Sequence, residues 1–378
     1  ETFNVLWDAI KEGLIQPLNE NYKRLEVDEK ASFKFLHDRI QQAAYALIDE
    51  EQKQTIHLKI GRLLLKNTPA DTIEDNVFEI VEQFNHSLEL LQNQTERLKV
   101  ADLNLIAGQK AKMATAYRAA INYFTNGRKC LTENSWDRSY DLTFNLFTKA
   151  AEAAYLNGNF KQMEQLVQVV LQHPRTLSDI VTVCEIQILA YVAQHQEREA
   201  IQIALILLKR LGISFPEEAT QEEVKLALQE MQVSLSSKPI QSLLDLPTMT
   251  NLQKILSMRV MAAIVSSAYH VSPSLMILLI LKQVKLSLEY GNVSESSFSY
   301  VCYGLFLCSI VKDIESGHQF GLLSLDLLKQ LCGKEFQVKI IHTFNAHVRH
   351  WKEHLRETLQ PLFENYEMGL ETGDIEFA

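Results

Sequence analysis

A group of histidines and a glutamate near the end of the chain has the spacing of metal ligands. Residues 350–354 read His-Trp-Lys-Glu-His, the H-x-x-E-H pattern. On one continuous helix, His350 and His354 would be two zinc ligands and Glu353 the base of a hydrolytic reaction. However, a turn is expected near Lys352 and Glu353 and would break that helix, and no third acidic ligand can be placed. We therefore expect no metal site and no catalytic residue, and zinc peptidase activity is a remote alternative.

The second candidate is His37, which follows a short alternating segment. Phe33 and Phe35 alternate with polar neighbours as in a half-buried strand, and Asp38 can cap a helix that carries Ile40, Ala43, Ala44 and Leu47. This pattern places His37 at a strand-to-helix junction. There an imidazole can reach a neighbouring domain and hydrogen-bond a phosphate oxygen. A structural, hydrogen-bonded histidine is the alternative interpretation.

The sequence contains none of the common phosphate-binding or nucleophile motifs. There is no Gly-x-x-x-x-Gly-Lys-Ser/Thr loop, since Gly333-Lys334 lacks both the upstream glycine and the hydroxyl. The glycine-rich and catalytic loops of protein kinases are also absent, as are serine or cysteine residues between correctly spaced glycines. We expect this chain to be non-enzymatic, and any ATPase or kinase activity to lie outside it.

Composition favours an acidic, helical protein. The 378 residues include only 13 Gly and 8 Pro, and 47% are hydrophobic, so we expect an all-α chain with ample buried surface. A net charge of -10 disfavours binding to nucleic acid or anionic membranes. The odd number of cysteines and their apolar surroundings indicate reduced core residues and a cytoplasmic setting. They are Cys130, Cys184, Cys302, Cys308 and Cys332.

One long segment without charged side chains raises the question of a membrane span. Met261 to Leu281 is 21 residues long, but Ser266, Ser267 and Ser272-Pro273 interrupt it. We interpret it as two buried helices joined by a turn. No leader sequence follows Glu1, and the start of a fragment is the expected interpretation.

From about residue 94, breaks in the helical pattern recur at regular intervals and predict helical hairpins of about 40 residues. The breaks between hairpins fall at Asn134-Ser135, His173-Pro174, Gly212, Met249-Thr250, Gly291, Gly333 and Gly373. The turns within hairpins are expected at Ala114-Thr115, Asn157-Gly158, Gln194-His195, Ser234 to Pro239, Ser272-Pro273, Lys312-Asp313 and Lys352-Glu353. Small residues on the second helices resemble those of tetratricopeptide hairpins, although that repeat has 34 residues. The fold class is therefore an all-α, tetratricopeptide-like helical-hairpin solenoid.

Two regions depart from this regularity. Phe215 to Pro247 contains a capping box, Thr220 to Glu223, and could be an ordered crossing loop or a hinge. In residues 1–50, a first helix through Leu14 precedes a hairpin in which Tyr22 to Val27 pairs with Ser32 to Leu36. Aromatic residues at helical spacing are expected in the core, namely Tyr290, Tyr300, Tyr303, Phe306 and Phe320.

The Leu36-His37-Asp38 order resembles the Met-His-Asp motif in the winged-helix domain of signal-transducing P-loop (STAND) ATPases. In that family the histidine contacts the β-phosphate of ADP, so the resemblance implies that role for His37. Phe35 to Tyr45, His57 to Leu64 and Ala107 to Lys112 look like large cyanobacterial-type signalling proteins. Those proteins join a serine/threonine kinase, an ATPase, helical repeats, a GAF domain and a histidine kinase. The resemblance implies ATP or ADP with Mg in the longer protein, and no cofactor in this segment.

These expectations divide the chain into two parts. Residues 1–65 would be the winged-helix-like end of an ATPase module, without DNA binding because no basic recognition helix is present, and residues 66–378 the repeat solenoid. The leading hypothesis is a regulatory segment that couples binding of a protein or peptide on the solenoid to an upstream nucleotide switch. Its partners would then include the adjoining ATPase and kinase domains. The alternative is a passive scaffold that spaces flanking catalytic domains.

Overall fold

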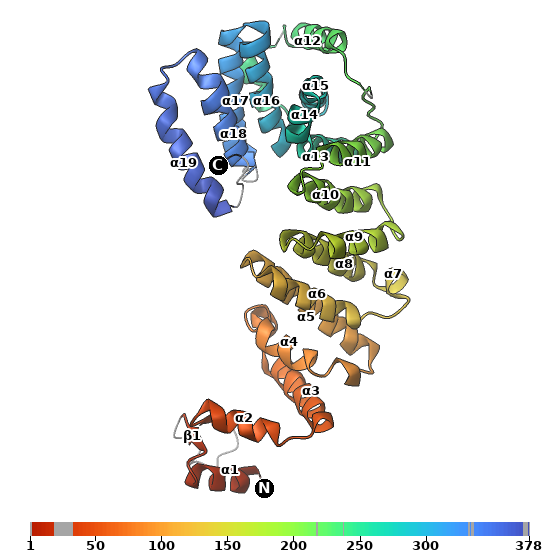
Figure 1. Cartoon of the computed structure of the whole chain (residues 1–378), viewed down its shortest axis with the longest axis vertical. Helices are drawn as coiled ribbons and strands as arrows, with labels where there is room; N and C mark the ends of the chain where they lie inside the picture. The colour runs from red at the N-terminus through yellow and green to blue at the C-terminus, as the bar shows by residue number, and fades with distance from the viewer. Residues whose placement is uncertain are drawn as a thin grey trace. The chain divides into compact units, whose positions relative to one another are not determined.

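The fold is all-α, as predicted, and consists mainly of paired helices (Figure 1). The computed structural model describes residues 2–18, 33–216, 218–236, 238–331, 333, 336–372 and 377. Two compact units, Glu1–Ala150 and Ala151–Ala378, meet within α8. In the first unit the helices are α1 (Thr2–Lys11), α2 (Asp38–Ala46), α3 (Glu50–Asn67), α4 (Val77–Asn85), α5 (Gln94–Met113), α6 (Tyr117–Lys129), α7 (Ser135–Arg138) and the start of α8 (Tyr140–Leu156).

The second unit holds the longer run of helical hairpins. Its helices after α8 are α9 (Phe160–Leu171), α10 (Leu177–Ala193), α11 (Glu197–Arg210), α12 (Gln221–Leu235), α13 (Leu252–Ala263), α14 (Val265–Val271), α15 (Pro273–Tyr290), α16 (Ser294–Phe306), α17 (Ile314–Leu331), α18 (Gln337–Thr343) and α19 (Arg356–Thr372). Two π-helical turns continue α16 and α18, namely η5 (Leu307–Val311) and η7 (Phe344–Val348). Short 3-10 turns complete the pattern, including η4 (Ile240–Asp245) and η8 (Arg349–Trp351).

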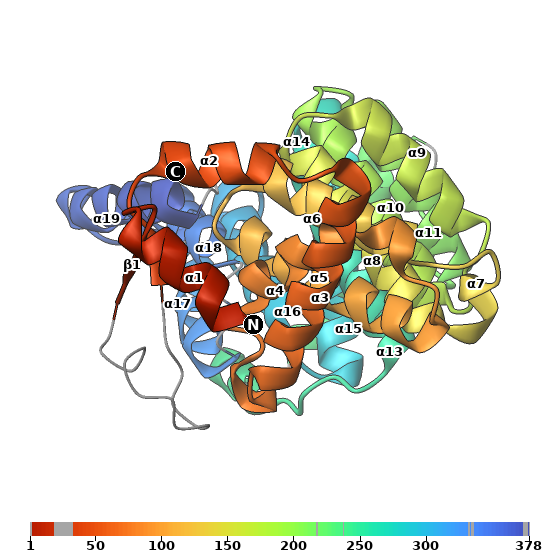
Figure 2. The same cartoon turned by 90° about the horizontal axis from the view of Figure 1, so that it is seen from below.

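The N-terminal segment is a helix, a two-stranded sheet and a second helix. Strand β2 (Phe33–Phe35) forms where the alternation predicts it, but its observed partner is β1 (Ile15–Pro17), paired antiparallel with Ile15 opposite Phe35. The predicted partner, Tyr22 to Val27, lies outside the described residues. The first helix ends at Lys11, earlier than expected, because Gly13 (φ +70°) turns the chain into β1. Figure 2 shows α1, β1 and α2 side by side. Assignment of residues 1–65 to an ATPase module stays a prediction.

The predicted turns separate the observed helices throughout the repeat region. The turn at Asn157-Gly158 lies between α8 and α9, and Gln194-His195 lies between α10 and α11. In the second half, Lys312-Asp313 separates η5 from α17, and Gly291 separates α15 from α16. Each break is thus confirmed within the described residues, and Gly373 lies outside them.

Several turns use the same left-handed cap, although their residues differ. Thr115, Gly158 and His195 all have φ between +56° and +73°. In each case the next residue donates its N–H to a carbonyl five positions earlier, as in a Schellman cap. These bonds are Ala116 to Ala111 (2.9 Å), Asn159 to Ala154 (2.8 Å) and Gln196 to Tyr191 (2.9 Å). Thr115 and His195 therefore occupy a conformation that glycine adopts without steric cost.

Substitutions at these caps should change stability in opposite directions. Thr115→Gly should raise the free energy of unfolding by about 1 kcal/mol, because it relieves the left-handed strain of a β-branched residue. Gly158→Ala should lower it by about 1 kcal/mol for the same reason. Urea unfolding followed by circular dichroism measures both, and equal effects of the two substitutions would contradict the shared cap.

The core of the C-terminal unit depends on a close crossing of α16 and α17. A Cβ atom added at Gly304 would lie 2.6 Å from the Gly317 carbonyl oxygen, so both glycines permit the approach. Tyr300, Tyr303 and Phe320 are buried around this crossing, as predicted, and Phe306 is buried as well. The expectation for Tyr290 is wrong: its ring is 39% exposed, because α15 ends there and the ring lies beside the Lys254 ammonium.

The irregular stretch between α11 and α13 is ordered where it is described. The predicted capping box starts α12, with Thr220 and Glu223 bonded in both directions. Farther on, the Asn292 side chain donates to the Leu243 carbonyl (2.8 Å) and accepts from the Tyr300 hydroxyl (3.0 Å). The Asn292 N–H also donates to the Pro247 carbonyl (2.8 Å). One buried asparagine thus fastens the crossing segment to α16.

The uncharged stretch from Met261 to Leu281 spans three helices, α13, α14 and α15, rather than two. The expected turn at Ser272-Pro273 is present, and an additional break occurs at Ile264. Among the described residues, none of the helices combines the length and apolar character needed to cross a bilayer.

Four of the five cysteines are free and buried, in agreement with the core interpretation. Burial raises the pKa of Cys130 and of Cys184 to about 11, so neither is a ready nucleophile at neutral pH. The fifth, Cys332, lies outside the described residues.

Candidate functional site

His37 lies at the strand-to-helix junction, as predicted. It has extended backbone angles (φ -141°, ψ 144°), and its carbonyl accepts the first helical hydrogen bond, from Ile40 (2.9 Å). His37 itself is therefore the N-cap of α2, and the expectation that Asp38 caps the helix is wrong. Asp38 occupies the first helical position, where its negative charge interacts favourably with the positive end of the helix dipole. The imidazole is exposed and forms no hydrogen bond to any described residue.

A second histidine, His57, belongs to no recognised motif and connects α2 to the repeats of the same unit. The Tyr45 hydroxyl lies 2.9 Å from His57 Nε2, and His57 Nδ1 lies 2.7 Å from Gln83 Oε1. Because an amide oxygen only accepts, Nδ1 carries the proton and Nε2 accepts from Tyr45. The helix that begins at His37 is thus connected through α3 to α4. No spacing rule predicts such a contact, since it joins positions 12 and 26 residues apart.

The H-x-x-E-H residues do not share a helical face. Residues 349–351 form the 3-10 turn η8, and α19 begins only at Arg356, so the predicted turn separates His350 from His354. His354 Nδ1 accepts the Arg356 N–H (3.1 Å) and so helps to start α19. Among the described residues, no three histidine, cysteine or acidic side chains are grouped for a metal ion.

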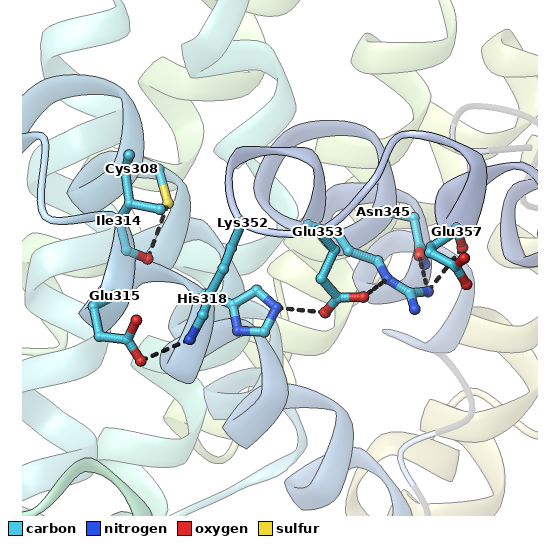
Figure 3. Close-up of polar contacts among 9 residues, drawn as sticks. Cys308, Ile314, Glu315, His318, Asn345, Lys352, Glu353 and Glu357 are labelled. Atoms are coloured by element: carbon cyan, nitrogen blue, oxygen red, sulfur yellow. Dashed lines mark hydrogen bonds and ion pairs between the residues drawn. The ribbon is translucent and has the colours of Figure 1, made fainter.

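Glu353 is instead the centre of a polar network (Figure 3). Its carboxylate lies 2.6 Å from His318 Nε2 on α17 and accepts from Arg349 Nε at 2.7 Å. Arg349 also donates to the Asn345 side chain (3.2 Å) and to the Glu357 carbonyl (2.9 Å). The network therefore fastens the turn before α19 to α17 and to η7, which is a structural task.

The network should make stability depend on pH. The hydrogen bond from Arg349, followed by that from His318, lowers the pKa of Glu353. A lowered folded-state pKa adds stability above the unfolded-state value, and that stability is lost as pH falls through the folded-state pKa. Glu353→Gln should cost about 1–3 kcal/mol at pH 7, and less below pH ~4. Glu357→Gln is the matched control, because only the main chain of Glu357 takes part; urea unfolding at several pH values decides.

An exposed apolar surface of the C-terminal unit lies on α19, which packs against α18 at the edge of that unit (Figure 1). Four large side chains on this helix, and one directly before it, are 50–64% exposed. We call them the α19 stripe: Leu355, Leu359, Phe363, Tyr366 and Leu370. The four on the helix follow one another at spacings of four, three and four, which places them within one narrow arc. Apolar faces of this kind normally pack against another helix.

The polar border of the α19 stripe is acidic. Glu364, Glu367 and Glu371 are all exposed and follow one another at spacings of three and four. Two copies of such a face would bring like charges together, whereas a basic amphipathic helix would complement them.

Comparison with known proteins gives one distant match. The chain is 25% identical over 387 aligned residues to hybrid signal transduction histidine kinase G of Dictyostelium discoideum. The alignment covers 90% of this chain but only 11% of the length of that kinase. No family model matches the sequence. The chain is therefore similar to a small part of a signalling protein.

Proposed function

We propose that this chain is a non-catalytic regulatory and interaction segment of a signal-transduction protein. The observation that carries the proposal is the α19 stripe, a regular apolar helix face left uncovered beside an acidic border. The similarity to a signalling histidine kinase supports a role in signal transduction. Because the match covers only 11% of that kinase, this chain would correspond to one segment of a larger signalling protein. The chain would bind an amphipathic helix with a basic flank and pass the effect on to flanking catalytic domains.

The second element of the proposal is a nucleotide switch that includes His37. Its exposed imidazole is free to meet a phosphate from a neighbouring ATPase domain, which would hold ATP or ADP with Mg. His37→Ala in the longer protein should then reduce the ADP retained after purification. Asp38→Asn, next to it on α2, is the matched control, and equal ADP retention in all three proteins would remove this role.

The alternative is a scaffold whose repeats only space catalytic domains. The double substitution Leu359→Ser and Phe363→Ser separates the two functions, because it removes apolar area from the α19 stripe without touching the core. If the segment is regulatory, the double substitution should alter ATP turnover or histidine phosphorylation in the longer protein and leave its unfolding curve unchanged. If the segment is a scaffold, the double substitution should change neither activity. The control Leu226→Ser, at an exposed position on α12, should change neither activity under both hypotheses. Zinc peptidase activity is the remote third possibility, and Glu353 is already engaged by Arg349 and His318.

A further inference from the structure

A predominantly apolar cavity of about 560 Å³ lies in the C-terminal unit and opens to solvent on one side. It is bounded by α14, α15, α16 and α18 and by both π-helical turns, with Phe298, Cys302 and Phe306 among its buried walls. This volume falls in the range of small-molecule sites in proteins. Three smaller cavities among the described residues, of 240–430 Å³, each include a lysine or glutamate in their walls.

The larger cavity has no such charge. None of the described residues that line it is Asp, Glu, Lys or Arg. Two of its polar residues are His342 and His347, whose rings lie 5.7 Å apart. Burial lowers the pKa of both imidazoles, and for His347 the neighbouring His342 and His350 lower it further. Neither of these two rings therefore readily supplies a positive charge to a ligand, and an ionised ligand that enters the cavity loses part of its hydration.

One polar side chain in the wall can meet a ligand. Thr343 is 5% exposed and lines the cavity, and its hydroxyl forms no hydrogen bond with another described side chain. Because the cavity opens to solvent, water can bond this hydroxyl. A ligand with one polar group can take the place of that water.

The backbone beside the cavity is irregular in a way that favours a binding site. Both π-helical turns contribute to the wall, through Ser309 and Ile310 in η5 and His347 in η7. Such turns insert an extra residue into a helix at a cost in stability, and they occur frequently at functional sites. Neither turn contributes to the α19 stripe.

We propose that this cavity binds an uncharged, predominantly apolar small molecule, whose single polar group hydrogen-bonds the Thr343 hydroxyl. Walls without Asp, Glu, Lys or Arg favour a neutral ligand over an anionic or cationic one. The site is separate from the α19 stripe, and ligand binding here stands whether or not the chain acts in signalling.

Two dyes with the same ring skeleton test the proposal in the whole chain. N-phenyl-1-naphthylamine is neutral, and 8-anilinonaphthalene-1-sulfonate adds one negative charge. In fluorescence titrations at pH 7, the neutral dye should bind one per chain and at least about tenfold more tightly than the anionic dye. Equal or tighter binding of the anionic dye, or binding without saturation, would overturn the proposal.

Variants locate the dye. Ser309→Phe fills the cavity and should weaken neutral-dye binding at least about tenfold, and Met276→Phe serves if that variant fails to fold. Leu226→Phe adds a ring outside the cavity and should leave binding unchanged. Thr343→Val should weaken it about 2- to 10-fold, since the dye N–H loses its acceptor. Neutral-dye binding that survives both cavity-filling variants, or disappears in Leu359→Ser with Phe363→Ser, would show that the dye binds elsewhere and would refute the proposal.

Discussion

Replacement of Gly317 with valine should destabilise the C-terminal unit by at least about 3 kcal/mol. A Cβ atom there would lie 2.4 Å from the Cys308 sulfur and 2.7 Å from the Gly304 carbonyl oxygen. The sulfur belongs to a buried side chain, and the carbonyl belongs to the backbone of the facing helix, so neither can move aside cheaply. The crossing of α16 and α17 would have to open.

Urea unfolding measures this effect, with Gly333→Ala as control. A Cβ atom at Gly333 would come no closer than 3.3 Å to its nearest neighbour, the Ser294 Cβ, and its effect should stay below about 1 kcal/mol. If Gly317→Val unfolds at the same urea concentration as the unsubstituted chain, the helices do not cross as closely as described.

Replacement of Asn292 with leucine should cost about 3–5 kcal/mol. Leucine has a similar volume but leaves the Tyr300 hydroxyl and the Leu243 carbonyl without their partners. Asn292 and Tyr300 are both buried, so water does not readily replace the lost bonds. The segment from 239 to 249 should then detach from the core before the rest of the unit unfolds.

Tyr300→Phe is the graded comparison, because it removes one hydroxyl and keeps the ring. It should cost about 1–2 kcal/mol and should leave the Asn292 bond to Leu243 intact. Amide hydrogen exchange would report the segment directly: Met249 donates its N–H to the Asn292 carbonyl (2.9 Å) and should lose protection in Asn292→Leu. Retained protection in that variant would mean that other contacts hold the segment.

The sequence predicts the hairpin boundaries because two local signals coincide at them. Many of the turns carry Gly, Asn, Ser or Pro, and the flanking segments have apolar stripes with helical period. His195 has the same left-handed conformation as Gly158, although the turn at Gln194-His195 contains no glycine. The apolar stripes of the flanking helices therefore predict the turns better than glycine does. The position of His37 was predictable for the same reason, because the spacing of apolar residues changes from every second residue before it to a helical pattern after it.

Other features depend on contacts that no local pattern contains. The observed partner of β2 is β1, about 18 residues earlier, and no local pattern in the sequence pairs these two segments. The network of Glu353 joins His318 and Arg349 from different elements, so the H-x-x-E-H spacing alone could not reveal it. The π-helical turns at η5 and η7 add a residue without any sequence signature. Exposure of the α19 stripe likewise depends on what packs beside the helix, because its leucines have the spacing of any core helix.

We propose that binding on the α19 stripe changes a nucleotide switch that includes His37. The direct measurement is the ADP content of the longer protein, isolated natively from its own cells, in four forms: unsubstituted, His37→Ala, Leu359→Ser with Phe363→Ser, and all three substitutions together. Coupling between two sites commonly amounts to about 5-fold or more. The account predicts that the stripe variant changes ADP retention by that factor, and that the change disappears when His37 is also replaced. Identical ADP content with and without the stripe substitutions, in a protein whose ADP depends on His37, would contradict it.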